Sequence, residues 1–151
     1  MTIQIPDDHP KQKLIFYVAQ DVDDEIRALV KKMLLDMVVS RGWVIGAPKF
    51  IDTVEDVGTR EVDVPDETVG GVHEIYSALP PNDLPRDIDE LHLKEVEHIV
   101  DSVKRLSLDK GLEFEFELDG RYVGTIEDGV VDVTLSKGLL DEWRSHFSAM
   151  P

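Results

Sequence analysis

The chain has 151 residues, no cysteine and a formal net charge of −16, from 32 Asp and Glu against 16 Lys and Arg. This length suits one domain with its own hydrophobic core, and 42% hydrophobic residues are too many for a disordered protein. The missing cysteine excludes disulfides, a catalytic thiol and thiolate metal sites, and the negative charge disfavours nucleic acids and anionic membranes as partners, because binding them requires Lys and Arg.

The first half of the chain begins with polar residues and continues with a predicted strand and helix. We expect residues 1–12 to be a flexible lead-in. This segment lacks the features of a secretory signal, so we expect the protein to be cytoplasmic. The apolar run KLIFYVA at 13–19 predicts a strand covered on both faces. A helix is predicted over 22–40, where one face of the helical wheel collects Val22, Ile26, Leu29, Val30, Met33, Leu34 and Met37.

The middle of the chain is harder to interpret. WVIGAPKFIDTV is β-rich but broken by Gly46 and Pro48, which favours a bent edge strand or two short strands. TREVDVP, at 59–65, alternates apolar and charged residues and predicts a further strand. We expect residues 66–87, rich in glycine and proline, to be a long irregular connection with a short strand near VHEIYSAL.

The second half gives clearer signals. A helix is predicted over 88–109, ended by Gly111. GLEFEFE alternates apolar and acidic residues, RYVGTIE is its expected hairpin partner, and VVDVTL is expected to add a third strand. A last helix over 136–148, capped by Ser136, has an apolar stripe made of Leu139, Leu140, Trp143 and Phe147.

The hairpin turns at Asp119-Gly120, and the loop length determines which side chains face the core. A two-residue loop would pair Glu117 with Tyr122 and would place charges on the apolar face. We therefore expect a three-residue loop that ends at Gly120 in a left-handed bulge, with Glu117 opposite Arg121.

This register separates an apolar row from an acidic one. Phe114 is expected opposite Gly124, and the predicted core-facing residues are Leu112, Phe114, Phe116, Tyr122, Gly124 and Ile126. The outward row on the first strand consists of Glu113, Glu115 and Glu117. We interpret this row as a solvated face or, functionally, as a contact surface for a cationic protein, which the acidic segment 52–67 could extend.

The order of these elements predicts an α+β fold with a single domain over 1–151. We expect a two-layer sandwich, with helices on one face of a mainly antiparallel sheet. The order βαβ(β)αββ followed by a C-terminal helix resembles that of ferredoxin-like folds. This resemblance concerns architecture alone, because such folds host unrelated activities.

Motifs for catalysis are few. The chain has no phosphate-binding glycine loop, no nucleophile elbow and no HExxH motif. HLKEVEH places His92, Glu95 and His98 at intervals of three residues, the spacing of carboxylate-bridged metal sites. On a helical wheel, however, His92 lies within the apolar stripe and His98 lies off it, so we interpret His92 as a core histidine and expect no metal. The acidic DVDDE segment at 21–25 is interpreted as a helix N-terminus rather than as a magnesium site.

These observations favour a small non-enzymatic domain that binds a basic protein, as an inhibitor, an immunity-like protein or a nucleic-acid mimic, with Glu113, Glu115 and Glu117 as the partner-binding row. No cofactor, nucleic acid or membrane is expected to take part. One alternative is a metal-assisted hydrolase or lyase that uses His92 and Glu95, with His73 or Asp21, or a metal held by Glu95 and His98. Another is a homo-oligomeric accessory domain, assembled through strand edges or the stripe around Trp143.

Overall fold

The computed structural model describes residues 9–52, 68–77 and 84–148, the last three by their backbone alone. The elements in chain order are β1 (Lys11–Val18), α1 (Asp24–Ser40), β2 (Lys49–Asp52), β3 (Val69–Tyr76), α2 (Arg86–Lys110), β4 (Glu113–Leu118), β5 (Arg121–Glu127), β6 (Val130–Val131), α3 (Val133–Leu135), the π-helical segment η1 (Ser136–Asp141) and α4 (Glu142–Ser148).

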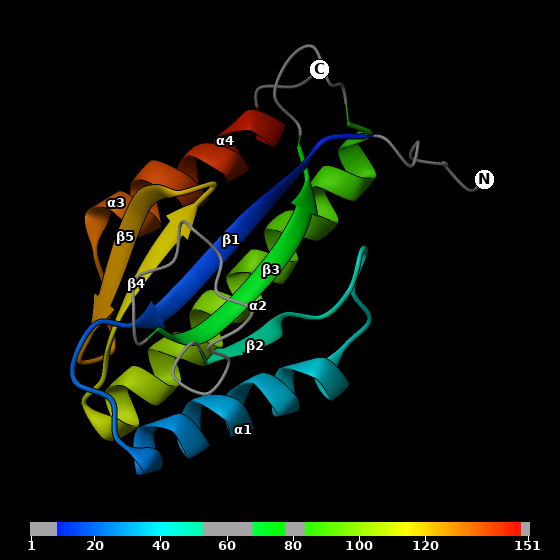
Figure 1. The fold of residues 1–151 in the computed structure, drawn as a ribbon. Helices are drawn as coiled ribbons and strands as arrows, with labels where there is room; N and C mark the ends of the chain where they lie inside the picture. Colours follow the sequence, from blue (N-terminus) through cyan, green and yellow to red (C-terminus); the bar gives the residue numbers. More distant parts are fainter. Residues whose placement is uncertain (1–8, 53–67, 78–83, 149–151) are drawn as a thin grey trace.

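The strands form one sheet in the order β2-β3-β1-β4-β5-β6, and every neighbouring pair is antiparallel. Figure 1 shows α1, α2 and the C-terminal helices on the same side of this sheet. The predicted α+β sandwich, with a mainly antiparallel sheet and helices on one face, is confirmed.

The core lies between the sheet and the helices. Phe16 of β1 stacks on Phe116 of β4, with ring centroids 5.7 Å apart. The predicted apolar face of α1 contributes Val30, Met33, Leu34 and Met37 to the same cluster. The helical period therefore predicted correctly which face of α1 is turned to the core.

The strand β3 is longer and more central than the sequence indicated. We expected a short strand within an irregular connection over 66–87, whereas β3 has 8 residues and pairs with both β1 and β2. The predicted strand at 59–65 lies outside the described residues. The strand β1 begins at Lys11, so the end of the expected lead-in over 1–12 is part of the sheet, and His9 Nε2 hydrogen-bonds the Ser77 carbonyl at 2.8 Å.

The loop of the β4–β5 hairpin differs from the prediction. Asp119 and Gly120 form a two-residue loop, and their φ angles of 51° and 79° are those of a type I′ turn. Leu118 therefore pairs with Arg121. The expected three-residue loop with a bulge at Gly120 is wrong.

A bulge further along the hairpin restores the separation of apolar and acidic side chains. The extra residue is Val123 on β5, and Gly124 therefore pairs with Phe116 and not with Phe114 as predicted. Tyr122, which we expected in the core, is 50% exposed. The hairpin thus combines the favoured two-residue turn with apolar side chains that face the core, because one extra residue reverses the facing of every later residue in the strand.

The C-terminal helical segment begins earlier than predicted and has a different cap. Asp132 Oδ1 accepts a hydrogen bond from the Leu135 backbone N–H at 2.9 Å, so Asp132, and not Ser136, is the N-cap. Trp143 is partly buried against the core, and its indole N–H donates to Asp89 Oδ1 at 2.9 Å. Much of the stripe proposed as an oligomer interface is therefore already packed; the side chain of Phe147 lies outside the described residues.

Candidate functional site

Three titratable side chains that the sequence suggested as candidates for a site meet inside the core. His92 and Glu95 come from the buried face of α2, and His73 comes from the inner face of β3. His92 Nδ1 lies 2.9 Å from Glu95 Oε1, and His73 Nε2 lies 3.1 Å from the same oxygen. We call these three residues the His–Glu–His cluster.

The hydrogen bonds define the role of each atom in this cluster. The Tyr76 backbone N–H donates to His92 Nε2 at 3.1 Å, so His92 is neutral and its Nδ1–H donates to Glu95. The Val44 backbone N–H donates to the second carboxylate oxygen, Glu95 Oε2, at 2.7 Å. His73 Nδ1 has no hydrogen-bond partner in the described part of the chain. Glu95 thus accepts hydrogen bonds from three different segments of the fold.

The pKa of Glu95 shows which effect dominates. Burial would raise this pKa, but the hydrogen bonds from His73, His92 and Val44 outweigh burial and lower the pKa from 4.5 to about 2. The carboxylate is therefore ionised at neutral pH although Glu95 is only 1% exposed.

The segment after α1 covers the cluster from one side. The Trp43 ring packs edge-on against His73, with centroids 5.1 Å apart, and lies 5.9 Å from the ring of His98. The Arg41 guanidinium lies 5.6 Å from the centre of the same indole. Together with the Val44 hydrogen bond, these contacts hold this segment against α2.

This geometry does not suit the catalytic alternative. His73 and His92 are fully buried, so a substrate has no access to them. A metal would need lone pairs that converge on one point, whereas Glu95 Oε1 and both nitrogens of His92 are engaged in hydrogen bonds. No group of three His, Cys, Asp or Glu side chains suited to a metal occurs in the described ranges.

The other residues considered for a metal site lie elsewhere. His98 hydrogen-bonds Ser40 Oγ of α1 at 3.0 Å, on the side of α2 that faces α1. Burial and the charges of Arg41 and Arg105 lower the pKa of His98. Asp21 is exposed ahead of α1, where Asp23 caps the helix through its hydrogen bond with the Ile26 N–H. The structure brings neither His98 nor Asp21 into the cluster.

The depressed pKa of Glu95 predicts a specific acid sensitivity. Between about pH 4.5 and pH 2 the unfolded chain protonates Glu95 while the folded protein keeps it ionised, so stability falls as the pH is lowered through this window. We expect this group to contribute about 3 kcal/mol to the loss. Urea unfolding measured across this range for the wild type and for Glu95→Gln tests it, because the variant should lose less stability on acidification. Equal losses in both proteins would contradict the assignment.

The outward glutamates of β4 lie where the alternation predicted. Glu115 Oε2 accepts a hydrogen bond from the Tyr17 hydroxyl at 2.7 Å, and burial, this bond and the charge of Glu117 raise the pKa of Tyr17. Glu113 pairs directly with Glu127 across the β4–β5 ladder. Like charges in this position repel each other.

Glu113 belongs to a larger acidic group at the end of the hairpin. A shallow pocket of about 550 Å³ is lined there by Glu113, Thr125, Glu127, Asp128, Val130 and Asp132. Asp132 is committed to capping, but Glu113, Glu127 and Asp128 have no ion pair with any described residue. We call these three residues the acidic strand end. Sequence reasoning named only Glu113. The signal that could have placed Glu127 and Asp128 beside it is the pair of Asp-Gly turns at 119–120 and 128–129, which begin and end the second strand of the hairpin.

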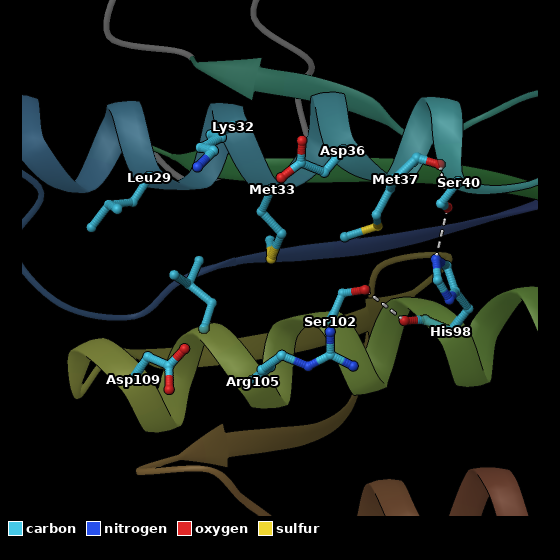
Figure 2. Close-up of a pocket in the computed structure, with 11 residues that line it drawn as sticks. Leu29, Lys32, Met33, Asp36, Met37, Ser40, His98, Ser102, Arg105 and Asp109 are labelled. Atoms are coloured by element: carbon cyan, nitrogen blue, oxygen red, sulfur yellow. Dashed lines mark hydrogen bonds between the residues drawn. The ribbon is translucent and has the colours of Figure 1, made fainter.

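A second hollow, of about 380 Å³, separates α1 from α2 on the helical side of the molecule. Figure 2 shows that Met33 and Met37 point from α1 into this groove, and Leu29 and Leu106 also line it. One end is closed by His98 Nε2, which donates to Ser40 Oγ because the Ser40 hydroxyl itself donates to the Met37 carbonyl. Four charged residues line the rest of the opening: Lys32, Asp36, Arg105 and Asp109.

Comparison of the chain with protein-family models, with curated proteins and with solved structures found no match. None of the helices within the described ranges is both long and apolar enough to cross a membrane.

Proposed function

We propose that this protein is an acidic, non-enzymatic binding domain that neutralises or inhibits a basic protein through the acidic strand end and the glutamate row of β4. The observation that carries the proposal is the pairing of Glu113 with Glu127 beside Asp128, with no cation from the described residues between them. Three negative charges held together by a rigid hairpin favour a cationic partner, whose binding would relieve their repulsion.

The glutamate row adds a regular spacing to this surface. Residues two apart on a strand are separated by about 6.8 Å, so Glu113, Glu115 and Glu117 project from the same face of β4 at equal backbone intervals. A row of evenly spaced negative charges resembles a polyanion in its electrostatics, which supports a partner that itself binds nucleic acid. The net charge of −16 would increase the rate of encounter with such a partner.

The catalytic alternative is less well supported. Its candidate residues, His92 and Glu95, are buried and committed to hydrogen bonds with Tyr76, His73 and Val44. We therefore propose no reaction for this protein.

Neutralising the acidic strand end is expected to weaken partner binding without loss of stability. The test variant combines Glu113→Gln, Glu127→Gln and Asp128→Asn; asparagine suits the positive φ of 51° at position 128. The matched control combines Glu25→Gln, Glu90→Gln and Asp101→Asn, three exposed acids elsewhere that give the same change in charge. Pull-downs from the source lysate at low and high salt, followed by titration calorimetry with the recovered protein, provide the measurement.

The wild type and the control should capture the same protein at low salt and release it at high salt, because screening weakens exposed charge pairs. The test variant should bind it about tenfold or more weakly, while its unfolding free energy stays equal or rises. If every protein captured by the wild type is captured equally by the test variant, this function is refuted.

A further inference from the structure

The rim of the groove between α1 and α2 has an ordered arrangement of charges. Its four charged residues are all exposed, and none makes an ion pair with a described residue. The two helices run in opposite directions along the groove, since Figure 2 shows Ser40 beside His98 at one end and Leu29 and Asp109 at the other. Figure 2 shows Lys32 across the groove from Asp109, and Asp36 across from Arg105.

Positive and negative charges therefore alternate both along each helix and across the groove. We call this set of four the charge square: Lys32 and Asp36 on α1, Arg105 and Asp109 on α2. A surface with this alternation is complementary to itself. When an identical surface is laid face to face on it by a two-fold axis in the contact plane, each positive corner meets a negative one, whether the axis runs along the groove or across it.

We propose that a second copy of this chain docks on the α1–α2 face, and that the two charge squares pair across a two-fold axis to form a homodimer. The inference does not depend on the proposed function, because the groove and the acidic strand end are lined by different residues.

Apolar side chains next to the charge square support this occupant. Leu35 and Val39 on α1 are 58% and 83% exposed, and on a helical wheel both lie within about 60° of Lys32, so they form an exposed apolar strip beside the groove. A second copy would cover these residues together with the groove. Met33 and Met37 at the base of the groove have flexible side chains that can adjust to the side chains of the partner.

The charge of the helices is also compatible with self-association. The chain as a whole would repel a second copy, but α1 has three basic and three acidic residues, and α2 has five basic and seven acidic. Half of the 16 basic residues of the chain thus lie on these two helices. This face is close to neutral, so a dimer through it keeps the acidic sheet surfaces apart.

The test uses two variants that each make the charge square repel itself. Lys32→Glu with Arg105→Glu leaves four negative corners, and Asp36→Lys with Asp109→Lys leaves four positive ones. Sedimentation equilibrium of the full chain should show a dimer for the wild type, and self-association about tenfold or more weaker for each variant. An equimolar mixture of the two variants should form a heterodimer, because every corner is again opposed by its opposite charge.

A matched control isolates the charge square from general charge effects. Lys31→Glu with Lys104→Glu makes the same change in net charge on the same helices, at exposed positions that do not line the groove. This control should dimerise like the wild type, and circular dichroism should show that all variants are folded. A monomeric wild type, or a mixture that associates no more than its separate components, would overturn the proposal.

Discussion

Replacing Glu95 by alanine is expected to lower the free energy of unfolding by about 3–5 kcal/mol. The substitution removes the carboxylate that accepts hydrogen bonds from His73, His92 and the Val44 N–H, and it leaves two fully buried histidines without this acceptor. It also opens a cavity, since Glu95 is among the largest fully buried side chains. Urea denaturation at about pH 7 gives the measurement.

Two further substitutions show how much of this loss of stability comes from the buried carboxylate of Glu95 and how much from replacing any glutamate of α2. Glu90→Ala removes an exposed glutamate from the same helix and should change stability by about 0.5 kcal/mol or less. Glu95→Gln keeps the volume and one acceptor oxygen, so its loss should lie between those of the two alanine variants. If Glu95→Ala is as stable as Glu90→Ala, the cluster contributes nothing to the fold.

A methyl group at Gly70 is expected to destabilise the protein by about 3 kcal/mol or more. A Cβ atom placed there would lie 1.9 Å from the Phe16 carbonyl oxygen and 2.6 Å from Tyr17 Cα, and these backbone atoms belong to the neighbouring strand β1. A backbone atom in the middle of a sheet cannot turn aside as the end of a long side chain can. β3 would have to separate from β1 or bend.

Gly46→Ala provides the matched control for this prediction. A Cβ at Gly46 would meet no atom within 4 Å, so stability should stay within about 0.5 kcal/mol or rise slightly. Thermal unfolding followed by circular dichroism compares the two variants under the same conditions. A Gly70→Ala protein with the transition temperature of the control would show that β1 and β3 can move apart at little cost.

The glutamate row of β4 and the His–Glu–His cluster differ in how far the sequence could predict them. The glutamate row of β4 follows from the alternation of one strand, and its outward position needed no knowledge of other elements. The His–Glu–His cluster required β3, α2 and the segment after α1 to meet, and the sequence placed β3 only as a short strand in an irregular connection. Glu95 lies at the edge of the apolar stripe of α2, so its burial depended on what packs against that edge.

The hairpin shows why even a local pattern can mislead. The alternation of β4 predicted the correct facing for Phe114 and Phe116, yet the choice of loop was wrong. Two solutions give the same facing: a three-residue loop, or a two-residue loop followed by a bulge. The residue that could have distinguished them is Gly124, which follows Val123 and has a φ of 150°, because an isolated glycine inside a strand often marks a bulge.

By itself, the sequence determined the fold class, the identity of α1 and α2, the left-handed end of α2 at Gly111 and the apolar face that α1 buries. Those features follow from side-chain period and capping, which act within a few residues. The tertiary structure decided the position of β3 in the sheet, the hydrogen-bond partners of Glu95 and the alternation of charges across the α1–α2 groove. These depend on side chains far apart in the chain, and packing and long-range hydrogen bonds alone bring them together.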